Sequence, residues 1–237
     1  MNLSRKWLTE FVDVPVSVIP DKAFSEAMTL SGSKVETTAD LGAEISNVVV
    51  GRILSMERHP DSDHMWICQI DARQAEPVQI VTGAWNIHVG DLVPVALHKS
   101  TLPGGVKITK GKLRGVPSNG MMCSFQELGL SHGCVPYACE NGILFLPAGT
   151  PVGEDIKKVL GLDDWVSDFE ITSNRPDCLS VIGLARETAA TFDRPFSVKT
   201  PEVKGVGDDI NKYMSVEVKD TDLCPRYTAR IVKNIKI

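Results

Sequence analysis

The sequence lacks three features that would each assign the chain to a class of protein. It contains no apolar run of the roughly 20 residues that a membrane-spanning helix needs, and its amphipathic start predicts no secretory signal. Its six cysteines include no CxxC pair, which argues against a zinc site and favours free thiols in a reducing cytoplasm. Its five histidines have no evident carboxylate or thiol partner in sequence, so no nucleophile–base pair is predicted. We therefore expect a cytoplasmic protein with no membrane association, no metal and no catalytic residue.

Acidic residues are missing from one long segment, although the chain as a whole is acidic. The net charge of -5 argues against a protein whose whole surface binds nucleic acid. Between Leu92 and Gln126, however, there is no Asp or Glu. The cations in or beside the extended run 106–113 are Lys107, Lys110, Lys112 and Arg114. This segment predicts a local surface that faces a polyanion, and the alternative interpretation is a solvated strand edge kept soluble by its lysines.

Hydrophobic periodicity divides the chain into helical and β-rich parts. Helical spacing is expected from Trp7 to Phe11, after Pro20, and over 154–160 and 180–191. The expected strands cover 34–38, 48–56, 65–70, 78–81, 92–97, 106–113, 143–146 and 165–171. Five or six strands within about a hundred residues favour a small closed β-barrel of the OB type. After a linker at 195–207, strands at 213–218 and 227–235 would open a further domain that is cut off.

Four groups of motifs follow one another along the chain. They are SRKWLTEFVD at 4–13; HPDSD at 59–63, IVTGAWN at 80–86 and KLRGVPSNGMMCS at 112–124; EITSNRPDCLS at 170–180 with GLARE at 183–187; and CPRY at 224–227. The second group resembles a tRNA-binding module found in several synthetases and in free-standing RNA chaperones. Together, the four groups are similar to the N-terminal part of the β subunit of bacterial phenylalanyl-tRNA synthetases.

This resemblance implies an α+β architecture in which an OB-fold barrel at 40–151 is inserted into a split helical/β domain. The halves of that domain would be 1–39 and 152–195, and 196–237 would be a linker and the start of a truncated editing domain. The partner would be the catalytic α subunit, in an (αβ)2 heterotetramer that uses ATP and Mg2+ to attach phenylalanine to tRNA. The editing site would lie beyond residue 237, so this chain alone would hold no cofactor and catalyse nothing.

Candidate tRNA contacts combine the basic residues with polar and aromatic residues from the same motifs. They are Lys107, Lys110, Lys112, Arg114, Ser118, Asn119, Asn86, Trp66 and Trp85. Trp85 stands where the family often has proline, and His64 stands where lysine is common. The indoles of Trp66 and Trp85 either stack on exposed bases or plug loops against the barrel. Met121 to Cys123 are expected in the core, and Asp177 or Ser180 is expected to cap the following helix.

Two other functions remain open at the level of sequence. One is a stand-alone OB-fold RNA chaperone, which would need only the barrel and not the flanking segments. The other is a protein–protein interaction module without RNA contact. The balance of 10 acidic and 8 basic residues over 40–151 keeps this second alternative open, because the barrel as a whole is not cationic.

Overall fold

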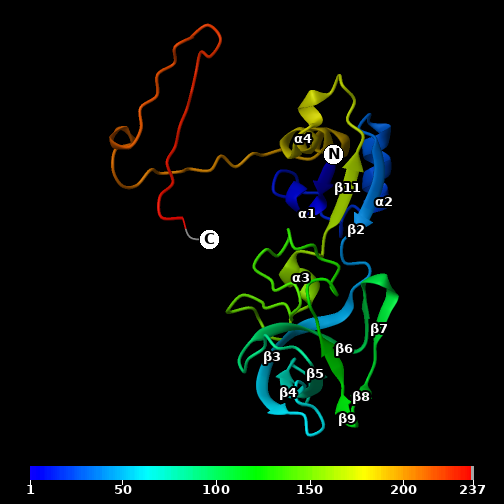
Figure 1. Ribbon diagram of the computed structural model, residues 1–237. Coiled ribbons are helices and arrows are strands. Elements are labelled where there is room, and N and C mark those ends of the chain that lie inside the picture. Colours follow the sequence, from blue (N-terminus) through cyan, green and yellow to red (C-terminus); the bar gives the residue numbers. More distant parts are fainter. Residues whose placement is uncertain (236–237) are drawn as a thin grey trace. The chain divides into compact units, whose positions relative to one another are not determined.

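A computed structural model describes residues 1–235 (Figure 1). The chain divides into two units, Met1–Val198 and Lys199–Ile237. The first unit contains a curled antiparallel sheet, a second sheet of three strands, and the helices. Within the described range, no helix combines the length and apolar character that crossing a membrane requires.

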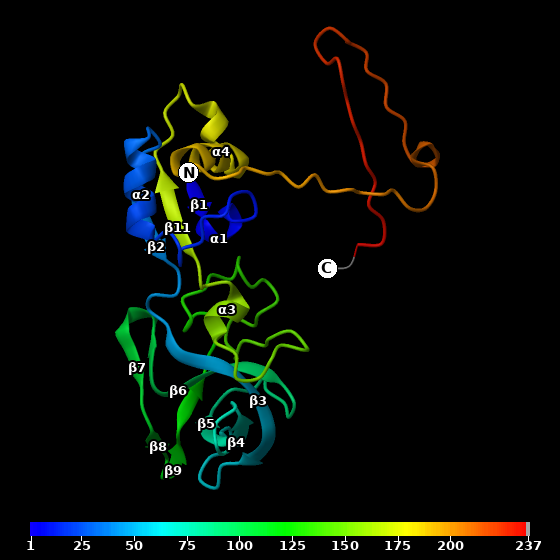
Figure 2. The ribbon, with the colours of Figure 1, turned by 180° about the vertical axis from the view of Figure 1, so that it is seen from behind.

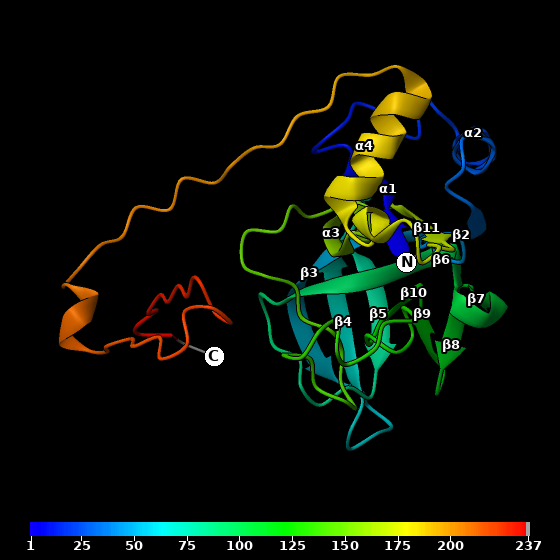
Figure 3. The same ribbon diagram turned by 90° about the horizontal axis from the view of Figure 1, so that it is seen from above.

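The curled sheet has the strand order β10-β6-β3-β4-β5, with β7 also paired to β6 (Figure 3). Its strands are β3 (Ser46–Arg58), β4 (Trp66–Asp71), β5 (Val78–Thr82), β6 (Leu92–Leu102), β7 (Val106–Ile108) and β10 (Gly120–Met122). A hairpin of β8 (Gly111–Leu113) and β9 (Val116–Ser118) lies between β7 and β10 in sequence. The backbone N–H of Asn119 donates to Gln79 O at 2.8 Å, and Val81 N donates to Ser118 Oγ at 3.1 Å. These bonds join the two ends of the curled sheet.

The apolar character of β6 follows from the burial of both its faces. Val93, Val95 and Leu97 pack inside the curl with residues of β3, β4 and β5. Leu92 and Ala96 point to the other face and share a core with parts of the segment 123–146. That segment therefore covers the outer face of the sheet. Met122 and Cys123 are buried, as the sequence predicts, whereas Met121 is only half-buried.

The three-stranded sheet has the order β1-β11-β2, formed by β1 (Asn2–Ser4), β2 (Val35–Asp40) and β11 (Trp165–Phe169). Leu3 pairs with Ser167, and Val166 pairs with Ala39, so β11 lies between strands that precede it by more than a hundred residues. The helices of this region are α1 (Arg5–Leu8), α2 (Asp21–Leu30) and α4 (Val181–Phe192). The remaining helix, α3 (Ile156–Leu160), contacts β3 and packs into the core on the outer face of the curled sheet. Figure 2 shows α2 and α4 beside the sheet, where their apolar sides share one core with β1 and β11.

Phe24 of α2 organises this core. Its ring stacks on Phe192 of α4 with centroids 5.7 Å apart, and it meets Phe169 of β11 edge-on at 6.4 Å. The Arg5 guanidinium lies 3.8 Å from the Phe24 centroid, and Arg5 Nη1 lies 3.6 Å from Asp21 Oδ1. Burial lowers the pKa of Arg5 to about 10, although Asp21 opposes this shift. Arg5 Nη2 also donates to Val14 O at 2.8 Å and to Ile19 O at 3.0 Å, so the first sequence motif supplies a buried cation that ties the segment before α2 to the core.

The start of α4 follows the predicted capping. Ser180 Oγ accepts a hydrogen bond from Gly183 N at 3.0 Å, which confirms Ser180 as the N-cap. Position 183 requires glycine because a Cβ there would lie 1.8 Å from Asp177 O. The capping motif and the glycine together let the preceding turn pack closely on the first turn of α4.

Several predicted elements are corrected. The helix near the N-terminus ends at Leu8 instead of continuing to Phe11, and the strand predicted over 106–113 breaks at 109–110 into β7 and β8. The strand predicted at 143–146 is wrong: Leu144 N and Leu146 N bond to Cys123 O and Leu92 O without forming a ladder. The strands predicted at 213–218 and 227–235 are also wrong. Two isolated strands have no face to bury, and over 199–235 the structure contains only a 3-10 turn at Ile210–Lys212.

Candidate nucleic-acid interface

The predicted basic segment forms an exposed edge of the curled sheet and its β8–β9 hairpin. Lys107 lies on β7, Lys112 lies on β8, and Lys110 lies between these strands, all with exposed side chains. None of them, nor Arg114, forms an ion pair with any of residues 1–235. Their positive charges are therefore uncompensated nearby, which suits contact with a polyanion.

Arg114 also holds the loop 59–65 against the hairpin. Arg114 Nη1 donates to Asp61 O at 2.9 Å. His59 Nδ1 accepts from Asp61 N at 3.0 Å, so the ring proton is assigned to Nε2, which lies 3.2 Å from Leu113 O. Because Arg114 has five N–H donors, the bond to Asp61 leaves donors for an anion.

The two indoles have different surroundings. The Arg58 guanidinium lies 3.8 Å from the Trp66 ring centroid, and Arg58 Nη1 donates to Asp63 O at 2.9 Å. One face of Trp66 is thus covered by the protein, and the contact steadies the loop 59–65. Trp85 is 70% exposed and lies in a groove of about 610 Å³ whose lining includes Met65, Met121, Glu127 and Glu140. Of the two rings, Trp85 is the one that remains open to stacking by a ligand.

Asn86 and Ser118 are buried and fully engaged in the fold. Asn86 Oδ1 accepts from Ile143 N at 3.1 Å, and Asn86 Nδ2 donates to Ile143 O at 3.0 Å. Ser118 Oγ accepts from Val81 N at 3.1 Å and donates to Gly120 O at 3.2 Å. These two members of the predicted contact set hold neighbouring segments together, so neither side chain is available to RNA.

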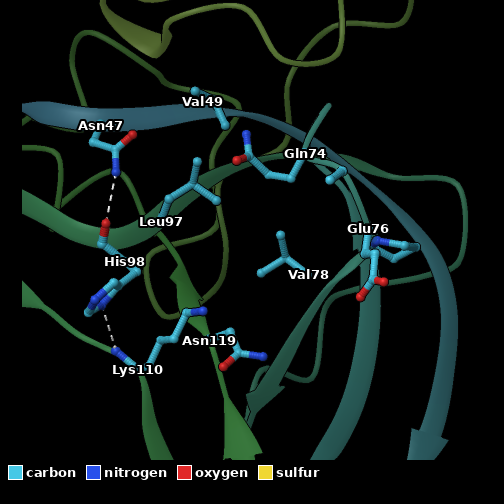
Figure 4. Close-up of a pocket in the computed structure, with 11 residues that line it drawn as sticks. Asn47, Val49, Gln74, Glu76, Val78, Leu97, His98, Lys110 and Asn119 are labelled. Carbon is cyan, nitrogen blue, oxygen red and sulfur yellow. Dashed lines mark hydrogen bonds between the residues drawn. The ribbon is translucent and has the colours of Figure 1, made fainter.

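Asn119 and Lys110 meet in a pocket of about 580 Å³ at one end of the curled sheet (Figure 4). Sequence reasoning identified these two residues but missed the others that face them, among them Asn47, Gln74 and His98. Asn47 has a φ of 55°, a left-handed conformation that asparagine adopts more readily than most residues. The asparagine near the start of β3 is therefore the one local feature of the sequence that indicates a left-handed backbone conformation there.

A cluster near the start of α4 has the residue types of a metal site. Ligand atoms of Asp177, Cys178 and Glu187 lie within 4.8 Å of one another. Arg175 Nη2, however, lies 2.9 Å from Asp177 Oδ2 and 2.6 Å from Glu187 Oε1. The Arg175 hydrogen bond holds the pKa of Asp177 at about 2, well below its usual range. The guanidinium thus takes the place of a cation, and we assign no metal there.

Comparison with known proteins shows which proteins this chain is similar to. A family model described as "Putative tRNA binding domain" matches residues 48–155. The whole chain is similar to phenylalanine–tRNA ligase β subunits, with 53% identity over 238 residues in Clostridium acetobutylicum and 49% over 241 residues in Clostridium tetani. The chain spans 29% of the length of each relative. Among solved structures, the C-terminal domain of Plasmodium vivax p43 matches 48% of this chain and 61% of its own, at 24% identity and a TM-score of 0.33.

Proposed function

Because the chain belongs over its whole length to the phenylalanine–tRNA ligase β-subunit family, we propose that it is the N-terminal tRNA-binding and scaffold module of such a ligase. One observation carries the proposal: the tRNA-binding match at 48–155 coincides with the curled sheet that presents the uncompensated cations. Lys107, Lys110, Lys112 and Arg114 would neutralise tRNA phosphates. Contacts of this kind depend strongly on salt and little on base sequence.

The proposed architecture is an OB-type barrel at 40–151 inserted into a domain made of 1–39 and 152–195. The pairing of β11 with both β1 and β2 supports it, because strands from either side of the barrel share one sheet. The bonds that join 118–119 to β5 support closure of the barrel. Residues 196–237 are proposed as a linker followed by the start of an editing domain.

In the whole enzyme, we assign the chain a catalytic α subunit as its partner, in an (αβ)2 heterotetramer of the cytoplasm. Such a ligase uses ATP and Mg2+ to attach phenylalanine to tRNA, and we assign that chemistry to the α subunit. The acidic cluster at Asp177 is already balanced by Arg175, so it is no candidate for the Mg2+. The part left to this chain is to bind and position tRNA.

A tRNA titration of the 237-residue chain tests the proposal, with tryptophan fluorescence followed at several salt concentrations. The logarithm of the binding constant should fall linearly with the logarithm of the salt concentration. Replacing Lys110 and Lys112 by alanine should reduce the steepness of that line by about 0.7 to 0.9 for each phosphate that these lysines neutralise. Lys204→Ala with Lys219→Ala is the matched control, since both lysines are exposed and form no ion pair among residues 1–235. This variant removes the same charge outside 48–155 and should leave the slope unchanged.

Absence of binding at low salt, or equal slopes for the two double variants, would overturn RNA contact by this edge. A second candidate, a protein-contact surface, is favoured by the carboxylates of Glu127 and Glu140 in the groove beside exposed Trp85, since these repel phosphates. Loss of α-subunit association in the Trp85→Ala β subunit, together with unchanged tRNA affinity, would support that alternative.

A further inference from the structure

The pocket at the end of the curled sheet has a volume and floor suited to a flat ring. Its volume of about 580 Å³ lies in the range of sites that hold a small ligand. In Figure 4, Val78 lies near the centre of the pocket with Leu97 and Val49 beside it. These aliphatic side chains form an apolar surface against which the face of a nucleobase can pack.

Three amide side chains surround that floor and have hydrogen-bonding capacity to spare. Asn47 uses its Nδ2 to donate to His98 O at 2.9 Å, and Gln74 uses its Nε2 to donate to Ala72 O at 3.2 Å. The side-chain oxygens of both are unused within residues 1–235, and the Asn119 amide makes no side-chain hydrogen bond in that range. An amide offers a donor and an acceptor together, which is the pattern that reads the edge of a base.

Two opposite charges lie on different sides of the pocket. Figure 4 shows Lys110 next to Asn119, whereas Glu76 lies across the pocket from His98. Neither Lys110 nor Glu76 forms an ion pair in the described part of the chain. His98 Nδ1 accepts from Lys110 N at 3.1 Å, so its Nε2 carries the proton and is a further donor. A phosphate is therefore favoured beside Lys110, and a group that donates hydrogen bonds is favoured beside Glu76.

We propose that this pocket seats one unpaired base of the bound RNA and prefers bases that carry an exocyclic amino group over uracil. The proposal rests on the tRNA-binding function and deepens it. Glu76 accepts from the amino group, Asn119 bonds the base edge, and Lys110 holds the adjoining phosphate. Uracil presents no amino group, and its single edge donor, N3–H, lies between two carbonyl oxygens that would face the Glu76 carboxylate unfavourably.

RNA is the occupant that the surroundings favour. Apart from Asn47, every residue that lines the pocket lies within the matched tRNA-binding region 48–155. Lys110 lines the pocket and also belongs to the exposed edge that carries Lys107 and Lys112. An RNA single strand whose phosphates contact that edge would therefore reach the pocket directly. Unpaired nucleotides are also the parts of an RNA whose base edges a protein reads.

Short single-stranded oligo(A), oligo(C) and oligo(U) test the proposal by fluorescence anisotropy with the full 237-residue chain at low salt. We expect oligo(A) and oligo(C) to bind about tenfold more tightly than oligo(U), the discrimination of one good base-edge contact. Glu76→Gln and Asn119→Ala should each bring that ratio toward one. Lys112→Ala, outside the pocket, should weaken binding of all three probes by one factor and keep the ratio.

Each alternative result has a separate meaning. Equal binding of the three probes, or a ratio that Glu76→Gln and Asn119→Ala leave unchanged, overturns the base pocket while salt-dependent tRNA binding stands. Failure of tRNA and all probes to bind overturns the proposed function as well. If AMP competes as strongly as oligo(A), the pocket is a free-nucleotide site and the RNA assignment is wrong. Glu76 is exposed, so Glu76→Gln tests the pocket even if Asn119→Ala perturbs folding.

Discussion

Replacing Asn86 by alanine is expected to destabilise the curled sheet and to leave intact the proposed RNA contact of the edge formed by Lys107, Lys110, Lys112 and Arg114. The Asn86 amide is 7% exposed and satisfies both the N–H and the C=O of Ile143, at 3.1 and 3.0 Å. A Cβ at Gly142 would lie 2.4 Å from Asn86 Nδ2, so the loop packs directly on the amide. Each buried group left without a partner costs about 1–3 kcal/mol. We expect the variant to lose about 2–4 kcal/mol, since the vacated space admits some water.

Urea unfolding followed by tryptophan fluorescence measures this change as a lower midpoint at constant m-value. Asn119→Ala is the matched control, because it keeps the backbone bond from Asn119 N to Gln79 O and truncates a half-buried amide that holds no neighbouring segment. This substitution should change stability by less than about 0.5 kcal/mol. The salt dependence of tRNA binding should be the same in Asn86→Ala as in the parent chain. An unchanged midpoint combined with weaker tRNA binding would refute the reasoning, because it would make Asn86 a contact residue.

Three further outcomes follow from titration and capping. Burial raises the pKa of Cys123 to about 12, so at about pH 8 a thiol reagent should label exposed Cys134 and reach Cys123 only on unfolding, as peptide mapping would show. Arg175 lowers the folded pKa of Asp177 to about 2. The ionised pair therefore stabilises the fold above about pH 4, and this stabilisation is lost as the pH falls. Arg175→Ala should make the urea midpoint less sensitive to acid. Ser180→Ala should cost about 1 kcal/mol by the same assay.

Sequence reasoning predicted strands best where local periodicity and burial agree. The run 92–97 is apolar throughout because both faces of β6 are covered, and it was predicted as a strand. The structure continues β6 to Leu102, where pairing with β7 and β3 satisfies the backbone although the side chains are less apolar. The error at 143–146 has the opposite cause, since those buried residues cover a sheet without joining it. Pairing of this kind depends on partners distant in the sequence, which periodicity does not contain.

The candidate site was predicted in part, for the same physical reason. Composition alone located the cationic edge, because the missing acids are visible in the sequence. Composition did not distinguish Ser118, which is buried, from Asn119, which is half-buried and lines a pocket, although the two are adjacent. The partners Gln74 and His98 come from separate strands and turns that only the curl of the sheet brings together.

The predicted tRNA contacts therefore separate by environment into residues with different consequences for binding. Asn86 and Ser118 stabilise the fold, Lys107 and Lys112 offer exposed charge, and Lys110 lies both on the charged edge and in the pocket proposed to seat a base. Phosphate contacts set affinity and its salt dependence, whereas base-edge contacts set discrimination. Affinity and base preference should then respond to different substitutions in this one module. Lys112→Ala is the decisive variant, because Lys112 lies outside the pocket. If it lowered the affinity and also changed the ratio of oligo(A) to oligo(U) binding, the charged edge and the pocket would act as a single site.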